Sequence, residues 1–430
     1  MNQVIEKKEL TNMLLNSPEL LPAVQSLTML NREGLAAFAA AGIPTHKHEE
    51  WKYTPVESLH PLNYAASNIP QSPYSGTLPN ASSGLRIVLR NGYFDNRLSS
   101  PNLASAGIKI HSLAATHKSE AEIGSLIDMH EEPFVALNCA LCRDGVVITI
   151  EKSADPSTLI EIIHLSDAGT GKQMHSPRIF VKAEKGSEAS ISESFISAGG
   201  NETCWTNAVC EIVIEENAKV NFVKMQLESE GSVLTDFTKA VQASNSTFDI
   251  VTVTLDGKLV RNNLHIRHNG TNCTSHLYGL FVADGEQLID NHTLVDHAMP
   301  NCFSNELYKG IVGGKATGVF NGKIFVRKDA QKTNAYQSNK TILLTDEAQM
   351  NAKPQLEIYA DDVKCTHGAT TGQLDEEALF YLRARGIGEN TARTLLNIAF
   401  AQDVLNNISD GAMRENLTLL VNQKLSDANG

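Results

Sequence analysis

The sequence has few aromatic residues and no long apolar run. Aromatic residues make up 6% of its 430 positions, and its two tryptophans are Trp51 and Trp205. This scarcity weakens the hypothesis of a polysaccharide-binding protein, because few aromatic side chains are available to contact a sugar. No segment approaches the roughly 18 consecutive apolar residues that span a bilayer, so we expect no membrane partner.

The sequence also lacks a basic run and a targeting segment. Its formal net charge is -13, which disfavours nucleic acid and anionic membrane surfaces as partners. The first residues, MNQVIEKKELTNMLL, contain no continuous apolar stretch and carry acidic residues early, unlike a signal peptide. The seven scattered cysteines do not form the pattern of a disulfide framework. We therefore expect a cytoplasmic protein with reduced thiols.

Two short motifs are incomplete versions of known sites. The segment GIVGGKAT at residues 310–317 has three residues between its outer glycines, where a P-loop has four, and Ala316 follows Lys315 in place of Ser or Thr. We interpret it as a tight glycine corner. Cys139 and Cys142 form a C-x-x-C without a second pair at zinc-site spacing. These thiols are predicted to be small buried side chains.

Three regions differ in their residue pattern. Residues 1–84 are predicted to form an N-terminal helical region and a linker, residues 85–372 a strand-rich core, and residues 373–430 a C-terminal helical domain. Short runs of Val, Ile, Phe and Thr alternate with Gly, Asn and Asp in the central region, which is typical of strands joined by turns. A helix is also predicted near residues 118–128.

Helix signals in the N-terminal region come from capping residues. Ser17 followed by Pro18 predicts one helix start. Asn31 is predicted to cap a helix that continues through Phe38 and ends at Gly42.

The central region contains a weak repeat of strand, corner and strand. Corners are predicted at Gly186, Asn217 and Asn245, at spacings of 31 and 28 residues. Gly270, Gly314 and Asp362 are candidate later corners. Such spacing is typical of a β-solenoid, in which each coil buries its inner face on its neighbours. The repeat alone leaves a β-sandwich with ordinary turns as an equally good interpretation.

The C-terminal region returns to helical patterns. Asp375 is predicted to cap a helix from Glu376 to Arg385 that Gly386 ends. Two further helices are predicted at 391–407 and 413–425. Their apolar stripes favour core packing over docking of a partner. The residues in these stripes are Ala392, Leu395, Leu396, Ala399 and Phe400 in the first, and Leu417, Leu419, Leu420 and Val421 in the second.

The candidate chemistry lies in two histidine-bearing segments. Five histidines fall between residues 265 and 297, and we expect most of them to be hydrogen-bonded or exposed: His265, His268, His276, His292 and His297. On a regular strand His292 and His297 would point to opposite faces. The run DDVKCTHGATTG places Cys365 and His367 on one face of a strand, with α-carbons roughly 6.6 Å apart.

Three interpretations of Cys365 and His367 stay open on residue type alone. They supply two metal ligands, but a closed metal site needs more. They also resemble a nucleophile with its base, yet the sequence names no orienting group or oxyanion hole. A structural role without chemistry carries as much weight as the two chemical interpretations together.

Several motifs together resemble the SufB/SufD family of iron–sulfur cluster assembly proteins. The resemblance runs from about residue 44 to 405 and is most specific from 291 to 390. The segments that carry it are HEEWKYT at 48–54, NHT at 291–293, SNELYKG at 304–310, GKI at 322–324, QKTNAYQ at 331–337, KPQLEIYADDVKC at 353–365 and HGA at 367–369.

The resemblance implies a mainly β fold, a right-handed parallel β-helix flanked by N-terminal and C-terminal helical regions. It implies a SufD-type subunit that pairs with a SufB-type scaffold along the β-helix edge and engages a SufC-type ATPase through its C-terminal helices. His367 would be a ligand to iron or a nascent cluster completed by the scaffold, and Cys365 a nearby thiol of less defined role. No cofactor would be tightly bound to the isolated chain, for which a homodimer is plausible.

We therefore expect a non-enzymatic subunit of an iron–sulfur cluster assembly complex. Two alternatives are kept: a SufB-type scaffold, and a thiol hydrolase that uses Cys365 and His367.

Overall fold

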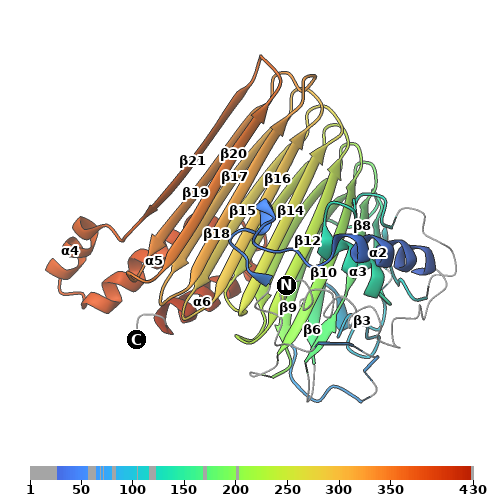
Figure 1. The fold of residues 1–430 in the computed structure, drawn as a ribbon, viewed down its shortest axis with the longest axis horizontal. Helices are drawn as coiled ribbons and strands as arrows, with labels where there is room; N and C mark the ends of the chain where they lie inside the picture. The colour runs from blue at the N-terminus through green and yellow to red at the C-terminus, as the bar shows by residue number, and fades with distance from the viewer. Residues whose placement is uncertain are drawn as a thin grey trace.

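The chain forms a long parallel β-solenoid with helices at both ends (Figure 1). The computed structural model describes residues 27–56, 64–67, 69–70, 72–79, 84–103, 105–115, 123–167, 172–199 and 203–427. From β8 to β21 successive strands alternate between two sheets, so each of these coils adds one strand to each sheet. The solenoid prediction is confirmed, and the β-sandwich interpretation is wrong.

The two sheets of the described residues contain eleven and ten strands. The first sheet contains β1 (Ala65–Ala66), β4 (Ile108–Ser112), β5 (Gly145–Ile150), β7 (Gln173–His175), β8 (Arg178–Ala183), β10 (Cys204–Ile214), β12 (Val233–Gln242), β14 (Leu259–His268), β16 (Leu288–His297), β18 (Thr317–Val326) and β20 (Gln349–Ile358). The second contains β2 (Leu85–Arg90), β3 (Tyr93–Phe94), β6 (Leu159–Ser166), β9 (Glu188–Ser197), β11 (Lys219–Leu227), β13 (Thr247–Thr254), β15 (Thr274–Ala283), β17 (Phe303–Val312), β19 (Asn334–Leu343) and β21 (Lys364–Gly372).

One corner of each coil from β8–β9 to β18–β19 uses a residue with positive φ. The predicted corners Gly186, Asn217 and Asn245 have φ of 71°, 61° and 60°, a region that Gly and Asn tolerate best. Each donates its backbone N–H to a carbonyl of the next coil, as Asn217 does to Ser244 at 3.0 Å. This column continues through Asn272, Asn301 and Lys332. The repeat is therefore fixed by backbone geometry at the corners.

The later predicted corners have mixed outcomes. Gly314, with φ of 52°, turns the chain between β17 and β18, which confirms that GIVGGKAT is a strand corner. Gly270 is not the positive-φ residue of its corner, which is Asn272. Asp362 contributes its carbonyl, which accepts the Lys332 N–H at 2.6 Å.

The space between the two sheets is filled by apolar side chains that alternate along each strand. The largest buried cluster includes Ile148, Val181, Ile212, Phe222, Phe248, Ile266, Leu277, Val295 and Phe320. Stacking of like side chains from coil to coil removes this surface from water and stabilises the solenoid.

Two helices cover the first coils. Helix α2 (Thr28–Ala41) packs on α3 (Pro133–Leu141), and Gly34 lets them approach so closely that a β-carbon there would lie 2.5 Å from Cys139 Cβ. Gly42, with φ of 68°, ends α2 as predicted. The predicted Asn31 cap is wrong: Asn31 lies inside α2, where its side-chain amide donates to the carbonyls of Cys139 and Cys142.

Other N-terminal predictions fall partly outside the described residues. Ser17 and Pro18 lie outside them, as does most of the predicted helix at 118–128. Residues 123–128 are turns and bends, so no helix lies in that described part. Helix α3 was not predicted.

The C-terminal helices are α4 (Glu376–Ala384), α5 (Glu389–Leu405) and α6 (Gly411–Asp427). Asp375 caps α4 by accepting the backbone N–H groups of Glu377 and Ala378, and Gly386 follows with φ of 87°, as predicted. Helices α5 and α6 bury Val404, Leu417, Val421 and Leu425 against the second sheet. The predicted α5 stripe is only partly right, because Ala392 is buried whereas Leu395 and Ala399 are exposed.

None of the described helices is both long and apolar enough to cross a membrane.

Candidate functional site

The solenoid ends in two exposed strands, β20 and β21. Each is the last strand of its sheet, and from Thr366 to Gly372 every residue of β21 is exposed. Helix α4 lies beyond β21 at the left of Figure 1, away from the coils. The described end of the stack is therefore open, in contrast to the middle coils, whose strands have neighbours on both sides.

The backbone of β21 presents hydrogen-bonding groups at this open edge. Lys364 donates its N–H to the Thr333 carbonyl at the β19 side, at 2.9 Å. Alternate residues of a parallel strand bond the same neighbour. The N–H groups of Cys365, His367 and Ala369 therefore face the open edge, where another strand could accept them.

Cys365 and His367 occupy the side of β21 that continues the solenoid interior. Their partners on β19 are Ala335 and Gln337, which are 0% and 3% exposed. Cys365 packs on a small apolar cluster around Ile324. Burial raises the pKa of its thiol, which opposes the thiolate that a nucleophile requires.

A polar column leads inward from His367. Register places His367 above Gln337, and Gln337 above Glu306 of β17. Gln337 donates to Glu306 at 2.9 Å, and Thr293 donates to the other carboxylate oxygen at 2.5 Å. Burial raises the pKa of Glu306 to about 7. The exposed imidazole thus lies at the mouth of a buried polar column.

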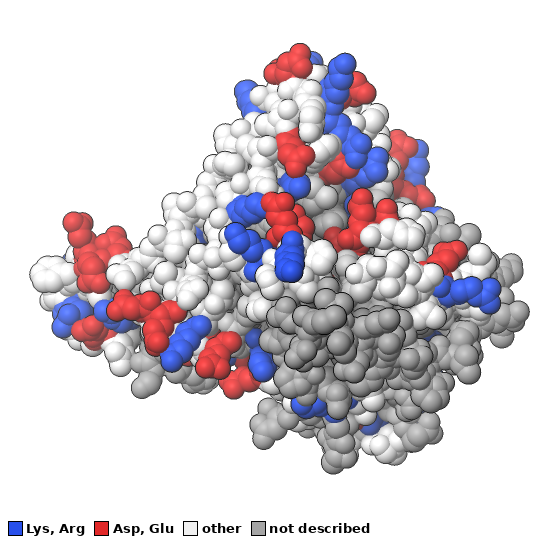
Figure 2. Space-filling model, viewed as in Figure 1, with Lys and Arg blue, Asp and Glu red and all other residues white. Residues whose placement is uncertain are grey.

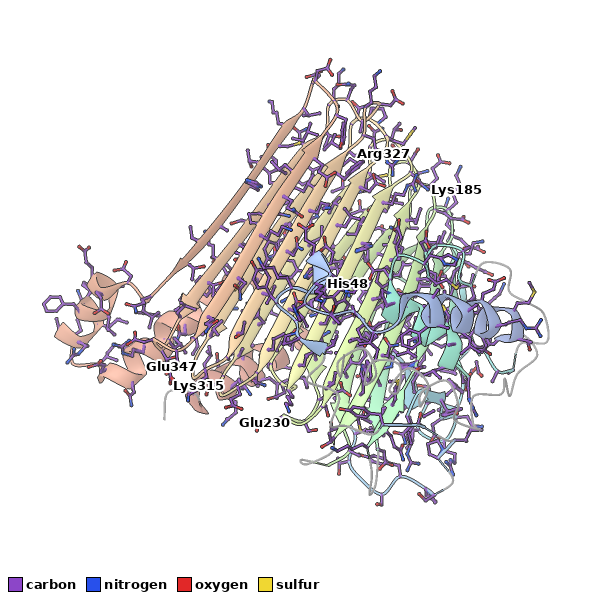
Figure 3. The ribbon with its side chains drawn as sticks, viewed as in Figure 1. His48, Lys185, Glu230, Lys315, Arg327 and Glu347 are labelled. Carbon is purple, nitrogen blue, oxygen red and sulfur yellow. The ribbon has the colours of Figure 1, made fainter. Side chains whose placement is uncertain are left out.

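The segment 45–56, called the strap, crosses the outer face of the first sheet and contains the 3-10 helix η3 (Glu49–Trp51). Trp51 is buried and lies 4.3 Å from the Arg261 guanidinium. Arg261 donates to the Glu50 carbonyl and pairs with Asp290, which also accepts the Thr54 hydroxyl. Figure 3 labels His48, which lies over the strands, whereas the other five labelled residues lie nearer the ends of the coils.

The strap also reaches the last strand of this sheet. Lys353 of β20 pairs with Glu49 at 2.5 Å, and Asn321 of β18 donates to Glu50 at 2.9 Å. HEEWKYT is thus a clamp across several coils, a role that residue types alone did not reveal. The usable sequence signal was the run of two acidic residues followed by a tryptophan. The residues that they contact lie on distant strands and could not be predicted from the sequence.

The histidines of 265–297 divide between the two faces as predicted for His292 and His297. His292 pairs with Glu50 of the strap at 3.3 Å, whereas His297 contacts Ser304 of the opposite sheet at 2.9 Å. His276 pairs with Asp249 at 2.6 Å, and His265 stacks edge-on against Phe237. His268 lies directly beside His297, a contact that the sequence analysis did not predict.

The C-x-x-C thiols are buried, as predicted. Cys139 lies on α3 and Cys142 directly follows it, and burial raises the pKa of both, that of Cys142 to about 12. Arg178 donates to the Cys139 sulfur at 3.2 Å.

The open end differs in charge from the strap. Figure 2 shows charged side chains gathered around the strap and few on the slope that β19–β21 form. Lys364 is the one Lys, Arg, Asp or Glu residue of β21. Exposed aromatic residues lie further along, where Phe380 and Tyr381 of α4 are 74% and 56% exposed. The end therefore offers uncharged strand edge and apolar surface.

Comparisons with known proteins agree with this architecture. The SUF system FeS cluster assembly SufBD core domain matches residues 164–400, and the SufBD protein N-terminal region matches residues 8–162.

Individual relatives span nearly the whole chain. An iron–sulfur cluster assembly SufBD family protein of Synechocystis sp. is 32% identical over 400 residues, which cover 89% of this chain and 88% of that protein. The iron–sulfur cluster assembly protein SufD of Escherichia coli is 29% identical over 397 residues, which cover 92% of each chain. A SufBD family protein of Mycobacterium tuberculosis is 27% identical over 424 residues, which cover 96% and 97%.

Proposed function

Because the chain belongs to the SufBD family of iron–sulfur cluster assembly proteins, we propose that it is a SufD-type subunit that pairs with a SufB-type scaffold through β20 and β21. The exposed edge of β21 carries this proposal. A strand whose N–H and carbonyl groups have no neighbour is a template for a strand of another chain. A relative of similar length that is named SufD supports the choice of subunit type.

Iron or a nascent iron–sulfur cluster is the proposed cargo at this interface. His367 offers an imidazole at the exposed edge, and Cys365 lies two residues before it on the same side of the strand. Two ligands do not close a metal site, so the scaffold supplies the others. This proposal explains why the chemistry of β21 is incomplete within one chain.

The C-terminal helices are the proposed docking site for a SufC-type ATPase. Helices α5 and α6 are anchored on the second sheet, whereas α4 exposes Phe380 and Tyr381. Large aromatic side chains exposed on an anchored helical unit are typical of protein contacts. The chain has no complete P-loop, so ATP hydrolysis would reside in the partner.

The experiment that tests pairing uses Ala369, whose N–H faces the open edge. Ala369→Pro removes this donor but no bond to β19, and proline is tolerated at such edge positions. Ala369→Val is the matched control, because it adds bulk and keeps the N–H. After co-expression with SufB-type and SufC-type partners, we expect the Pro variant to recover much less scaffold than the Val variant or the wild type. Equal recovery by Pro and Val variants would contradict pairing through this edge.

The alternatives make different predictions for the isolated chain. A homodimer through the same edge would dissociate in the Ala369→Pro variant, as measured by sedimentation. The hydrolase hypothesis gains no support from the geometry, because burial raises the pKa of the Cys365 thiol.

A further inference from the structure

A second histidine–cysteine group lies inside the solenoid, away from the open edge. The pattern His-x4-Cys-x-Ser occurs twice with an offset of 29 residues, first from His268 to Ser275 and then from His297 to Ser304. Neighbouring coils align the copies, so that His268 pairs with His297 and Ser275 with Ser304. The repeat therefore places two imidazoles and two thiols together.

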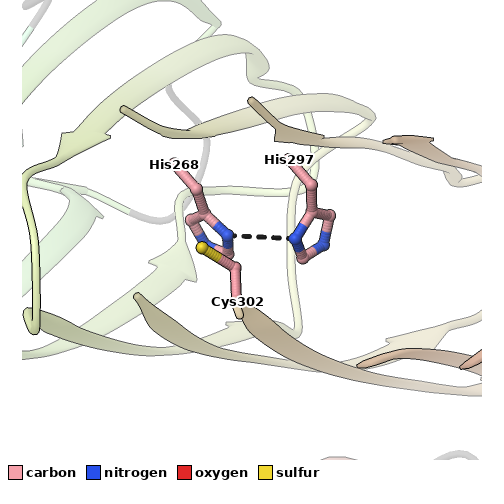
Figure 4. A group of neighbouring side chains, drawn as sticks. All are labelled: His268, His297 and Cys302. Carbon is pink, nitrogen blue, oxygen red and sulfur yellow. Dashed lines mark hydrogen bonds between the residues drawn. The ribbon is translucent and has the colours of Figure 1, made fainter. Parts of the chain in front are cut away.

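Both copies are fully enclosed. His268, His297, Cys273 and Cys302 are each 0% exposed. The Nδ1 atoms of the two histidines are 3.1 Å apart, with their rings at 90° (Figure 4). The ligand atoms of His268, His297 and Cys302 all lie within 4.8 Å of one another. Among the described residues, no other such group of three was found.

The hydrogen-bond network fixes which ring nitrogen of His268 carries its proton. Gln242 directs its amide nitrogen to the carbonyls of Ser246 and Thr274, so its oxygen accepts the Ser275 hydroxyl at 2.5 Å. The Ser275 hydroxyl donates its single proton to Gln242, so its oxygen accepts the N–H of His268 Nε2, which lies 2.8 Å away. The Nδ1 atom of His268 is therefore a bare lone pair.

The same reasoning assigns His297. Both rings are completely buried, which disfavours the charged form of an imidazole. Because His268 Nδ1 is bare, the His297 Nδ1–H donates to it. His297 Nε2 then accepts from the Ser304 hydroxyl at 2.9 Å. A single proton therefore lies between the Nδ1 atoms of His268 and His297, and without it the two lone pairs would face each other.

We propose that His268, His297 and Cys302 bind a divalent transition-metal cation of borderline softness, such as Zn²⁺ or Fe²⁺. Two imidazoles and a thiolate are the ligands such ions prefer. Tetrahedral bonds of about 2.05 Å would place two nitrogens about 3.3 Å apart, close to the distance between the Nδ1 atoms. Ser275 and Ser304 would accept the Nε2 protons and hold both rings in place.

Protons balance on binding. The His297 proton moves from Nδ1 to Nε2 and is donated to Ser304, whose hydroxyl rotates. Cys302 loses its thiol proton to solvent, so each cation bound releases one proton. The site keeps a charge of +1.

The site lies close to a surface corner of the solenoid. Cys302 lies at a corner, directly after the exposed Asn301 and three residues after the exposed Met299, although its own side chain is buried. Ser304 shares a column with Cys365, two strands further along, or about 10 Å at the usual strand spacing. The site is thus separate from His367 and does not depend on the proposed pairing.

The test is a titration of the full, chelator-treated chain with Co²⁺, which reports thiolate ligation by its charge-transfer absorption. We expect one equivalent with this absorption. Cys302→Ser should abolish the charge-transfer absorption, and His297→Gln should weaken binding roughly tenfold or more. Absence of charge transfer in the wild type, or its persistence in Cys302→Ser, would overturn the proposal.

Two controls separate this site from other thiols and from the open end. Cys210→Ser changes another buried cysteine, two strands before His268 in the same sheet, and should bind as the wild type does. His367→Ala should also leave the absorption unchanged, even if it impairs cluster assembly. Should Cys302→Ser fail to fold, the Cys365→Ser variant decides, because it lacks the thiol of the open edge: one proton released per Zn²⁺ supports the buried site, and no release contradicts it.

Discussion

The middle coils and the last two strands of the solenoid are built from the same repeat but meet different surroundings. In these coils Arg178 of β8 and Glu211 of β10 are both 0% exposed, paired with each other and covered by α3 and the 124–126 segment. At the end, β21 is exposed along almost its whole length, and His367 is the last residue of the polar column that it forms with Gln337 and Glu306. The same ladder thus yields a buried core where it is covered and an exposed strand edge where it is open.

The largest expected difference concerns the buried ion pair. Arg178→Met leaves Glu211 as a buried, unpaired carboxylate, which costs about 3–5 kcal/mol. Urea denaturation should show this loss. The double variant Arg178→Met/Glu211→Gln should recover most of the stability, because it removes both charges and keeps an oxygen that accepts the N–H groups of Gly124 and Leu126.

An exposed pair provides the contrast. Lys185 and Glu216 pair at 2.7 Å near a corner, with side chains 65% and 45% exposed. Lys185→Ala should therefore leave the midpoint of urea denaturation unchanged. If Arg178→Met and Lys185→Ala had equal effects, the distinction between covered and open parts would fail.

A second prediction concerns the pH dependence of Glu306, the last buried acid below His367. Its pKa is raised from 4.5 to about 7 by burial. Between these values the folded state holds a proton that the unfolded chain has lost, so stability falls as pH rises through this window. At about 1.4 kcal/mol per unit, the total is about 3 kcal/mol.

Glu306→Gln should remove this contribution. The difference in unfolding free energy between variant and wild type should therefore grow in favour of the variant from pH 5 to pH 7.5. Because other groups titrate in both proteins, only this difference is diagnostic. A constant difference across the window would show that the carboxyl is not protonated in the folded state.

A smaller effect is expected at the corners. Asn217 has φ of 61°, which costs a residue with a β-carbon about 1 kcal/mol unless it is Asn or Gly. Asn217→Ala should be less stable by about that amount, and Asn217→Gly should match the wild type. Thermal unfolding of the two variants measures the difference, and equal losses would point to the Asn side chain instead of the backbone.

Local signals allowed much of the fold to be predicted. Gly186, Asn217 and Asn245 were predicted as corners because each separates two strand-like runs in a repeat, and their positive φ explains why Gly and Asn stand there. Asp375 was predicted as a cap, and its carboxylate accepts two backbone N–H groups. Asn31 shows the limit of such signals. Its amide bonds to α3 more than one hundred residues away, and no local pattern contains that partner.

The candidate sites differ in the same way. Cys365 and His367 were found because both lie in one short segment, and the resemblance gave them a context. The contact between His268 and His297 depends on the register of two coils, which a single strand does not reveal. The 29-residue offset between the two His-x4-Cys-x-Ser copies was a usable signal, since a solenoid aligns residues that repeat at the coil length.

The most direct test of the central claim is the iron and sulfide content of the complex reconstituted with SufB-type and SufC-type partners. His367 is exposed on the terminal strand, so His367→Ala should leave folding and complex stoichiometry unchanged. The account predicts roughly tenfold less cluster, or lower still, in that complex, by analogy with the loss of other metal-site residues. Wild-type cluster content in an intact His367→Ala complex would contradict the assignment of the open end as the cluster assembly site.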